Sequence, residues 1–393
     1  MRVLLIVNTL PPRDLSGAGE QVAQLAWALR QAGQEVEILG RGAGGACGSK
    51  LLFPVTAVLP ALRRLRALRP DVVQVHESDG GLVLAALRAR RGSGAGPLLC
   101  ALQQVSYREE ARAVRSVRDV STGRVVARPT WREWIFRWFR APLHVALGRF
   151  TARRCDLLFA PSARTAGELC RDYGVGAAVT LPNVTGAPLP GRDSIETSFG
   201  PPGARFLYVG RLRVRKGVEV LLEALAHLGD TAPAIAIDIV GDGERSRPLQ
   251  RLAHRLGLAD RVRFLGRLGA GEIRVLLEGC RALVVPSLYE GMPLVVLEAM
   301  EASRAVVASA VSGIPEVVID GETGWLVPPE QVDALAAALL EAWRQPEEAE
   351  RRGRNGRDRL DQRYRPRHGA ETWLAAVQSR MRMGGLGTAG GET

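Results

Sequence analysis

Short apolar runs alternate with amphipathic stretches along most of the chain. In the first half, strand-like runs occupy residues 2–8, 35–39, 51–55, 71–75, 98–102, 156–160 and 178–181, and helical periodicity occupies residues 20–32, 59–68, 80–90 and 162–173. The run at 2–8 is almost wholly apolar, which is typical of a strand buried on both faces of a parallel sheet. Strands that alternate with helices predict a parallel α/β sheet whose ligand loops lie at the carboxyl ends of the strands.

The same alternation starts again at residue 205. Strand-like runs cover residues 205–210, 235–240 and 262–266, and late helical stretches cover residues 331–343, 347–361 and 368–380. A chain of 393 residues is long enough for two cores. We therefore expect an α/β domain at 1–182, a Pro- and Gly-rich linker at 183–204, a second α/β domain at 205–362, a C-terminal helix at 363–383 that crosses back to the first domain, and a disordered tail at 384–393.

Residues 106–155 are rich in arginine and contain one distinctive helical pattern. Large apolar side chains recur there at i, i+3, i+4, i+7 and i+8, on Trp131, Trp134, Ile135, Trp138 and Phe139. Such a face packs on a domain core, or it lies in a membrane interface, where Trp and Arg are favoured. The arginines of residues 108–140 favour an anionic membrane surface or a diphosphate-linked acceptor nearby, and the core alternative stays open.

The charge is distributed unevenly along the chain. The net charge is +12, and residues 1–190 hold 26 Arg or Lys against 14 Asp or Glu, whereas the remainder holds 27 of each. A basic first half favours an anionic partner there, such as an anionic membrane, a phosphate-bearing lipid or an acidic glycan, and an arginine-rich solvated surface is the alternative. Only the charge supports a nucleic-acid partner, so we expect none.

Cysteine usage and hydropathy bear on the compartment. The five cysteines show no Cys-x-x-Cys spacing, which argues against both a disulfide framework and a zinc site. The apolar runs are too short to span a bilayer, and residues 2–7 resemble a strand rather than a signal peptide. We expect a cytoplasmic protein, peripheral at the inner face of the membrane if the aromatic face binds lipid.

Predicted strand ends in the first half carry candidate site residues. These are Gly17 and Gly19 after the first strand, His76 at the end of the run 71–75, and Gln103 and Gln104 after the run 98–102. Glycines allow a backbone to approach a ligand closely, and polar residues just past a strand are typical of a ligand cleft. A purely structural role for His76 stays open.

A cation cluster follows the first strand of the second half. Gly210 and Arg211 precede Lys216, one of only two lysines in the chain, and a predicted helix begins directly afterwards. Arginine offers a planar fork and lysine a point charge, so the cluster predicts a diphosphate site on physical grounds.

A second loop, at residues 286–293, leads from a strand into a helix. Pro293 is suited to the start of a helix, so the loop directs backbone N–H groups and the positive end of the helix dipole at an anion or at sugar oxygens. Glu290 lies on the loop, and Glu298 lies about two helical turns further along. Ionised carboxylates accept hydrogen bonds, and a pair of neighbouring hydroxyls is a natural donor to them.

These motifs together resemble one enzyme family. Glu-Gly-x-Pro-Leu at 290–294 with a second Glu at 298, Gly-Arg-Leu and Lys-Gly within 210–217, and Gly-Asp-Gly at 241–243 resemble the signature of the retaining, nucleotide-sugar-dependent GT-B glycosyltransferases of family 4, or glycosyl transferases group 1. Residues 312–316 and 320–324 resemble two further segments of that family. The resemblance implies two Rossmann-like domains facing a central cleft. It also implies transfer of a hexose from a nucleotide-diphosphate sugar to a glycan or lipid-linked acceptor.

The resemblance also implies roles for individual residues. Glu290 holds the donor hexose, Glu298 binds the nucleotide ribose, and Arg211 and Lys216 offset the charge of the leaving nucleoside diphosphate. The catalytic candidates are Glu290, Arg211, Lys216 and His76. The implied donor-binding set is Gly17, Gly19, Gly210, Arg211, Lys216, Gly241, Arg267, Glu290, Gly291, Met292, Leu294, Val295 and Glu298, and the acceptor-side candidates are His76, Gln103 and Gln104.

Some positions depart from the family pattern. Gln103 stands where many members carry a histidine, and Ser16 stands where the first loop glycine is usual. Val184 replaces the glycine of the family's Pro-Asn-Gly. A glutamine positions groups but cannot act as a general base. The expected chemistry survives this change if the leaving phosphate itself takes the acceptor proton. No Asp-x-Asp is present, so we expect neither a metal nor a cofactor besides the sugar nucleotide.

Two other functions stay open on the sequence. A nucleotide-sugar epimerase on the same architecture needs acid and base groups, for which His76, Glu77 and Glu290 are the few candidates. A non-catalytic, glycosyltransferase-like binding subunit is favoured by Gln103 and disfavoured by the intact Glu290 and Lys216.

Overall fold

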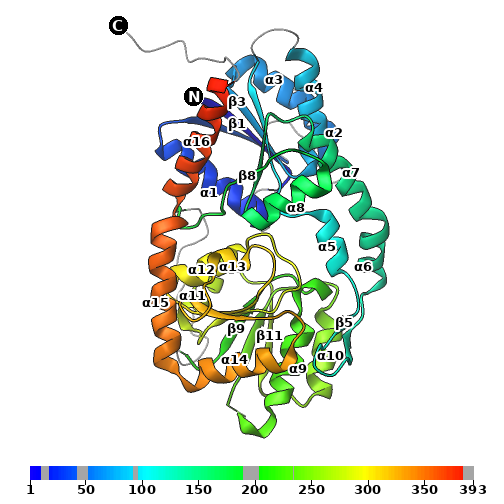
Figure 1. The fold of residues 1–393 in the computed structure, drawn as a ribbon, viewed down its shortest axis with the longest axis vertical. Helices are drawn as coiled ribbons and strands as arrows, with labels where there is room; N and C mark the ends of the chain where they lie inside the picture. Colours follow the sequence, from blue (N-terminus) through cyan, green and yellow to red (C-terminus); the bar gives the residue numbers. More distant parts are fainter. Residues whose placement is uncertain (10–16, 42–51, 92–95, 189–202, 233, 384–393) are drawn as a thin grey trace. The chain divides into compact units, whose positions relative to one another are not determined.

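The computed structural model describes residues 1–9, 17–41, 52–91, 96–188, 203–232 and 234–383. Contacts between residues divide the chain into two compact units. The first comprises Met1–Ser106, Leu143–Ala187 and Tyr364–Thr393, and the second comprises Tyr107–Pro142 and Pro188–Arg363 (Figure 1). The predicted tail and most of the predicted linker lie outside the described residues.

The first unit is a doubly wound α/β structure around a six-stranded parallel sheet of order β2-β1-β3-β4-β7-β8. Its strands are β1 (Arg2–Val7), β2 (Glu35–Gly40), β3 (Val72–His76), β4 (Leu98–Leu102), β7 (Leu157–Ala160) and β8 (Val179–Thr180). Its helices are α1 (Gly17–Gln31), α2 (Phe53–Thr56), α3 (Val58–Leu68), η1 (Ser78–Gly80), α4 (Gly81–Arg91), most of α7 (Ala141–Ala152), α8 (Ala163–Tyr173) and α16 (Pro366–Met383). The predicted parallel α/β class is confirmed.

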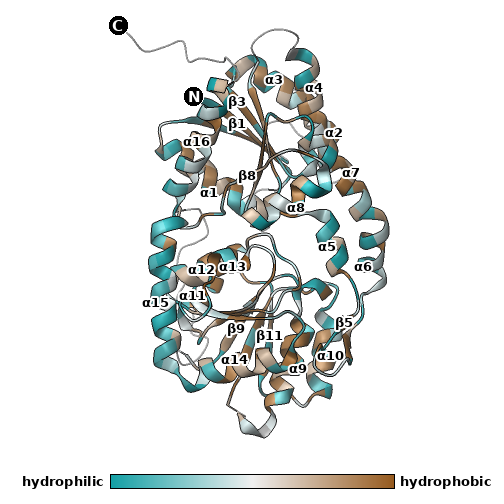
Figure 2. Cartoon of the chain, viewed as in Figure 1, coloured by the Kyte–Doolittle hydropathy of each residue, from teal (hydrophilic) through white to brown (hydrophobic). Residues whose placement is uncertain are grey.

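Strand β1 shows why this sheet needs helices on both faces. Its side chains alternate between two cores, with Leu4 and Ile6 in one and Val3, Leu5 and Val7 in the other. Helices α1 and α16 contribute to the second of these cores and pack against each other. Figure 2 shows the strands of this sheet as hydrophobic, which is the pattern that a doubly covered sheet requires.

The second unit contains another six-stranded parallel sheet, of order β11-β10-β9-β12-β13-β14. Its strands are β9 (Phe206–Val209), β10 (Ile237–Val240), β11 (Val262–Gly266), β12 (Leu283–Val285), β13 (Val306–Ser309) and β14 (Gly324–Val327). Its helices are η3 (Val214–Lys216), α9 (Val218–Leu228), η4 (Gly229–Thr231), α10 (Ser246–Arg255), α11 (Ala270–Gly279), α12 (Leu294–Glu301), α13 (Ile314–Val317), α14 (Val332–Arg344) and α15 (Pro346–Arg363). The two sheets thus repeat one architecture.

Residues Tyr107–Pro142 form an excursion that packs with the second unit, although the prediction placed them in the first domain. The excursion contains α5 (Tyr107–Ala113), the short antiparallel pair β5 (Val117–Arg118) and β6 (Val125–Ala127), α6 (Trp131–Ile135) and the π-helical turn η2 (Phe136–Arg140). Val114, Val117 and Ala127 are buried in the core that the second unit's sheet forms. Burial of these apolar side chains is the physical reason for the corrected boundary.

Two local predictions were also wrong. Residues 51–55 were expected to form a strand, but Phe53–Thr56 form the short helix α2. Pro54 lies in its first turn, where the fixed φ of proline favours a helix and its missing N–H costs nothing. The core alternative for the aromatic face also fails, because its five large apolar side chains, on Trp131, Trp134, Ile135, Trp138 and Phe139, are exposed.

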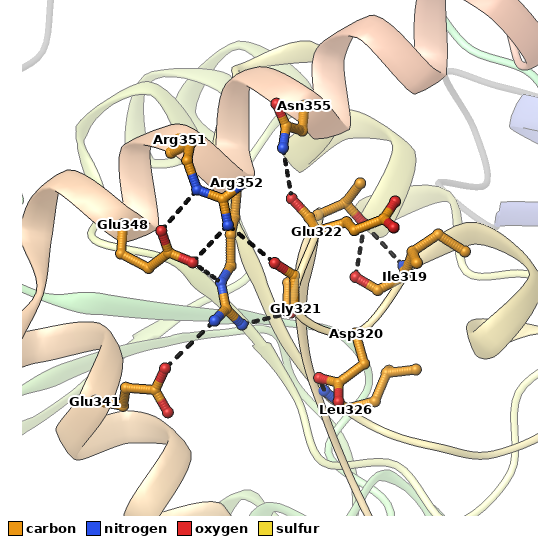
Figure 3. Close-up of polar contacts among 12 residues, drawn as sticks. Ile319, Asp320, Gly321, Glu322, Leu326, Glu341, Glu348, Arg351, Arg352 and Asn355 are labelled. Carbon is orange, nitrogen blue, oxygen red and sulfur yellow. Dashed lines mark hydrogen bonds and ion pairs between the residues drawn. The ribbon is translucent and has the colours of Figure 1, made fainter.

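A cluster around Arg352 fixes the turn at residues 319–324 to α15, a helix that Figure 2 shows as largely hydrophilic (Figure 3). Arg352 donates from Nε to Glu348 Oε1 at 2.7 Å and from Nη1 to the Gly324 carbonyl at 2.9 Å. Its guanidinium also lies 3.9 Å from the centre of the Trp325 ring. Hydrogen bonds from Arg351 and Arg352 lower the pKa of Glu348 to about 2, so this carboxylate stays ionised.

We predict that Arg352→Lys weakens the second unit. Lysine lacks the planar fork that joins Glu348 and Gly324, so the free energy of unfolding should fall by about 2 kcal/mol. For a unit of this size that corresponds to a decrease in Tm of roughly 4–8 °C in calorimetry. The control Arg354→Lys, in the exposed pair with Glu350 at 3.8 Å, should change little. Equal effects of the two substitutions would contradict the role assigned to Arg352.

Candidate functional site

The second unit gathers the predicted donor-binding residues at one edge of its sheet. Arg267 follows β11, Gly241 follows β10, Gly210 follows β9, and Glu290 follows β12. These four strands are consecutive neighbours in the sheet and run parallel. Their carboxyl ends therefore meet at the same edge, although the residues are far apart in the sequence.

The centre of this edge is a topological switch point. From β9 the chain moves to β10 and β11 on one side, and it then returns to β12 on the other side of β9. Open α/β sheets bind ligands outside the carboxyl ends of the strands at such a point. The loops after β9 and β12 carry Lys216 and Glu290, and the two side chains form an ion pair there in which Glu290 is buried and Lys216 is 16% exposed.

Glu290 is held by further groups from both loops. Ser287 Oγ donates to Glu290 Oε1 at 2.8 Å, and Arg215 Nη1 lies 3.8 Å from Glu290 Oε2. Arg215 also donates to the Tyr289 carbonyl at 3.1 Å, and its own carbonyl accepts from the N–H of Leu288 at 2.8 Å. The two loops are therefore joined through side chains and through the backbone, and Glu290 has a fixed position.

The electrostatics of the pair keep Glu290 ionised. Burial alone would raise the pKa of this carboxyl, but the positive charges of Lys216 and Arg215 and the hydrogen bonds from Lys216 and Ser287 outweigh it and lower the pKa below its usual value. Burial also lowers the pKa of Lys216, while Glu290 opposes that change. Glu290 is thus a permanent hydrogen-bond acceptor at neutral pH rather than an acid.

Two glycines allow the loops to approach this closely. Gly217 has φ +66°, and a Cβ added to it would lie 1.9 Å from the Pro286 carbonyl oxygen. Gly241 has φ +133°, and a Cβ there would lie 1.9 Å from the Gly210 carbonyl oxygen. Any side chain at these two positions would push the strand ends apart, so the close approach requires glycine.

The helix after Glu290 begins as the sequence predicted, to within one residue. Pro293 is the residue before α12, with φ −72°, and Leu294 and Val295 form the first turn of the helix with partly buried side chains. Glu298 lies on the second turn and is also partly buried. The N-terminus of α12 therefore points to the edge that carries Lys216, which favours a bound anion.

The remaining donor candidates differ in exposure. Gly291 and Met292 are buried, and Gly291 accepts from the N–H of Gly313 at 3.1 Å. The neighbouring Ser312 has φ +48°, a left-handed conformation that glycine adopts at less cost, and the motif that this segment resembles has glycine there. Arg211 and Arg267 are exposed and form no ion pair with any residue that the structure describes. Both are open to a ligand.

Three residues that the structure places here were not predicted from the sequence: Ser287, Arg215 and Glu110. Glu110 is a buried acid on α5, and its Oε1 lies 2.9 Å from Arg215 Nε. Ser287 and Arg215 directly adjoin recognised motifs, which is the signal that could have found them. Glu110 carried no such signal, because its partner lies in a different unit from the one predicted for it.

In the first unit, β3 positions His76 within a buried polar chain. Trp373 Nε1 of α16 donates to Gln74 Oε1 at 2.6 Å, and Gln74 Nε2 lies 3.0 Å from His76 Nε2. Burial lowers the pKa of His76 to about 3, so its imidazole is neutral over the physiological range. Because Gln74 offers an N–H to the ring, His76 Nε2 acts as the acceptor in this contact.

The residues around Gln103 form a second polar group of the first unit. Glu77, directly after His76, has φ +60°, which is rare for a residue other than glycine and is typical of functional sites. Its Oε1 accepts from the N–H of Gln104 at 3.2 Å, and with its amide turned to satisfy both groups Gln103 donates to Glu77 Oε2 at 3.3 Å. The Gln104 and Asn183 amides bond each other reciprocally at 3.3 and 3.2 Å. Gln103 and Gln104 are therefore both held in place by hydrogen bonds.

The glycine loop after β1 is only partly described. Helix α1 begins at Gly17, which is exposed, and Gly19 is buried in its first turn. Ser16 lies outside the described residues. The switch point of the first sheet falls between β1 and β3, so the start of α1 and His76 belong to the same edge of that sheet.

No group of three or more His, Cys, Asp or Glu side chains in the described part of the chain could hold a metal ion. Within the same residues, no helix is both long and apolar enough to cross a membrane.

Comparison with known proteins identifies the class. The chain matches the family of glycosyl transferases group 1 over residues 196–359 and Glycosyltransferase Family 4 over residues 15–184. It is 30% identical over 388 residues to a glycogen synthase of Mycobacterium tuberculosis, covering 92% of this chain and 90% of that one. The chain belongs to the family 4, or group 1, glycosyltransferases, and its fold is GT-B.

Further matches agree with this assignment. A D-inositol 3-phosphate glycosyltransferase of Streptomyces scabiei is 37% identical over 204 residues, covering 48% of this chain and 46% of that one. Among solved structures, a sucrose-phosphate synthase from Thermosynechococcus elongatus superposes with a TM-score of 0.71 at 20% identity, covering 98% of each chain. Anabaena Alr3699/HepE in complex with UDP-glucose gives a TM-score of 0.67 at 18% identity, covering 96% of this chain and 100% of that one. These structural matches carry the fold alone.

We predict strong energetic coupling between Lys216 and Glu290. Lys216→Met leaves the buried Glu290 carboxylate with only the more distant Arg215 as a cation and should lower the free energy of unfolding by about 2–4 kcal/mol. Adding Glu290→Gln should recover part of the loss. A double-mutant cycle by urea unfolding measures the coupling. The exposed pair Arg274 and Glu278, at 2.8 Å, is the control and should couple by at most about 0.5 kcal/mol. Additive effects of the two site substitutions would show that the pair is not buried as described.

The low pKa of His76 predicts a specific pH dependence. In the unfolded chain this histidine has the ordinary pKa of 6.5, and in the folded chain its pKa is about 3, so the unfolded state binds an extra proton between these values. Stability is therefore lost as pH falls below 6.5, by up to about 1.4 kcal/mol per pH unit.

His76→Gln removes this contribution, so the variant should gain stability relative to the native protein as pH falls from about 7 to 5. The free energy of urea unfolding at several pH values gives the slopes. His254→Gln, at an exposed histidine, should follow the native slope. Parallel curves for the native protein and His76→Gln would mean that His76 is not buried in a neutral state.

Proposed function

We propose that this glycosyltransferase transfers a hexose from a nucleoside-diphosphate sugar to a hydroxyl group of a glycan or lipid-linked acceptor, with retention at the anomeric carbon and without a divalent metal. The observation that carries the proposal is the buried pair of Lys216 and Glu290 at the switch point of the second sheet. It joins a cation for a phosphate to a fixed carboxylate for sugar hydroxyls.

The second unit binds the donor in this proposal. Lys216, the exposed Arg211 and the N-terminus of α12 take the diphosphate, and Glu290 accepts hydrogen bonds from the hexose. Glu298, on the second turn of α12, accepts from the ribose hydroxyls. Arg267 and Gly241 lie further along the same edge and border the nucleotide.

Bond cleavage relies on stabilisation of charge. As the bond from the anomeric carbon to the phosphate oxygen breaks, negative charge develops on the diphosphate, and Arg211 and Lys216 offset it. The new bond forms from the acceptor oxygen to the same face of the anomeric carbon, and the acceptor proton passes to the leaving phosphate oxygen. Because arginine, lysine and a helix terminus supply the positive charge, the step needs no metal.

The first unit supplies positioning groups rather than a base. His76 is neutral and buried, and Gln103 is bonded to Glu77, so neither accepts the acceptor proton in this proposal. His76, Gln103 and Gln104 orient the acceptor side by hydrogen bonds, and Gly17 and Gly19 allow the start of α1 to approach the substrate.

Neither alternative from the sequence is favoured. An epimerase needs an acid and a base that change charge near neutral pH. The pKa values of His76 and Glu290 are both lowered from ordinary values of 6.5 and 4.5, so neither side chain changes its charge near neutral pH. A non-catalytic subunit has no need of the paired Lys216 and Glu290, which the chain retains.

We predict that a nucleoside diphosphate stabilises the native protein. UDP, GDP and ADP are tested in turn, with UDP first because UDP complexes occur among the similar structures. A ligand that binds only the folded state adds RT ln(1 + [L]/Kd), or about 2.7 kcal/mol at a hundredfold excess over Kd, which a thermal shift assay detects.

The variants locate the binding. Lys216→Ala and Glu298→Ala should each lose the thermal shift together with transfer activity, and Arg255→Ala, at an exposed arginine of α10, should keep both. A shift retained in Lys216→Ala would overturn the site, and no shift with any nucleotide would overturn the donor class. The anomeric configuration of the product, read by NMR, tests retention separately.

A further inference from the structure

The excursion of the second unit presents an unusual aromatic face. Trp131 is 67% exposed, Trp138 is 61% exposed and Phe139 is 74% exposed, and Trp134 and Ile135 complete the face at 41% each. Single exposed apolar residues are ordinary, but a continuous set of five large ones indicates a binding surface. We call these five residues the aromatic face.

The helix that carries this face already uses its opposite side for packing. Glu133 is buried, closes a capping box with Thr130, and accepts from the N–H of Val214 at 2.6 Å. Phe136 packs against the core of the second unit. The helix is thus held on its inner side by Glu133 and Phe136, while the aromatic face remains exposed.

Arginines lie among the aromatic rings. Trp134 and Trp138 stack with centroids 6.3 Å apart and planes inclined by 2°, and Arg137 lies 5.6 and 5.4 Å from their centroids. Arg132 lies 5.3 Å from the centre of Trp131, and Arg140 is exposed at the end of the turn η2. Cation–π contacts hold charged heads beside apolar rings, as an interface between water and hydrocarbon requires.

The charge of the excursion is directed outward. Residues 107–142 contain nine arginines and four carboxylates. Three of the carboxylates are buried. Glu110 pairs with Arg215, and Asp119 accepts from Ser121 and Thr122. Glu133 accepts from Thr130 and Val214. Arg112, Arg115 and Arg124 pair with Glu109, Glu330 and Glu223, and the other six arginines leave the excursion with excess positive charge. The complementary partner is negative.

We propose that the aromatic face docks on the surface of an anionic phospholipid bilayer. Trp and Phe enter the boundary between head groups and acyl chains, and Arg132 and Arg140 pair with lipid phosphates. A second copy of the chain is a poorer occupant, because a two-fold contact would bring the same arginines together. No described helix spans a membrane, so the attachment is interfacial and reversible.

The first experiment measures sedimentation of the full chain with vesicles. Vesicles of phosphatidylcholine with about 30% phosphatidylglycerol should bind the protein in a salt-dependent manner, and vesicles of phosphatidylcholine alone should bind it much more weakly. Trp134→Ser with Trp138→Ser should weaken binding at least about tenfold. The matched control Leu59→Ser, at a residue that is 67% exposed, should bind as the native protein does.

Charge variants test the electrostatic part. Arg132→Glu with Arg140→Glu should weaken binding at least about 30-fold, whereas Arg247→Glu with Arg251→Glu, exposed on α10 of the same unit, should change it little. Equal losses in the two pairs would show that total charge rather than this face drives binding, and would overturn the proposal.

Two other outcomes would also overturn it. One is equal binding, or no binding, of the native protein to anionic and neutral vesicles. The other is a native dimer in analytical ultracentrifugation that the two Trp substitutions convert to monomer without any vesicle binding. The Trp variant should keep its Tm and its thermal shift with nucleotide, so loss of folding and failure of the donor site are recognised separately.

Discussion

A lysine and a glutamate can remain buried in the second unit only because each neutralises the other. An isolated charge in that position would cost several kcal/mol, so the pair requires both loops to stay in place. The two loops meet through a close backbone approach to Pro286 that Gly217 permits, and Gly241 permits a similar approach of the loop after β10 to Gly210. Arg215 extends the constraint to Glu110 on the excursion. The proposed donor site, the strand ends and the excursion are thus parts of one electrostatic arrangement.

The first unit positions its buried candidate residue without an ionised partner in this chain of hydrogen bonds. The neutral His76 is bonded to Gln74, and Trp373 donates to Gln74 in turn. A neutral chain of donors and acceptors positions groups but moves no proton near neutral pH, and the ionised Glu290 likewise keeps its charge state. Both charge states agree with the proposed reaction, in which the leaving phosphate takes the acceptor proton.

The sequence predicted the features that depend on local pattern. Continuous apolar runs such as 98–102 predicted buried parallel strands correctly, and the motifs at 210–217 and 290–298 located the loops that the structure brings together. The prediction of a strand at 51–55 was wrong, because a proline with apolar neighbours fits the first turn of a helix as well as it fits a short strand. The sequence could not decide whether the aromatic face is buried or exposed, because a core helix and an interfacial helix have the same periodicity. The pair of Glu110 and Arg215 depends on long-range packing, which no local pattern encodes.

The excursion is translated well before part of the core against which it packs. Val114, Val117 and Ala127 belong to a core to which α9 contributes, and the first residue of α9, Val218, is translated about a hundred residues after Val114. At 5–20 residues per second, these side chains wait roughly 5–20 s for α9, and longer for the core residues of α14 (Val332–Arg344). During that interval the basic, tryptophan-rich segment of the nascent chain exposes the side chains of its inner side as well as those of its outer side. The nascent chain therefore passes through a stage of high exposure to chaperones that the finished protein never shows.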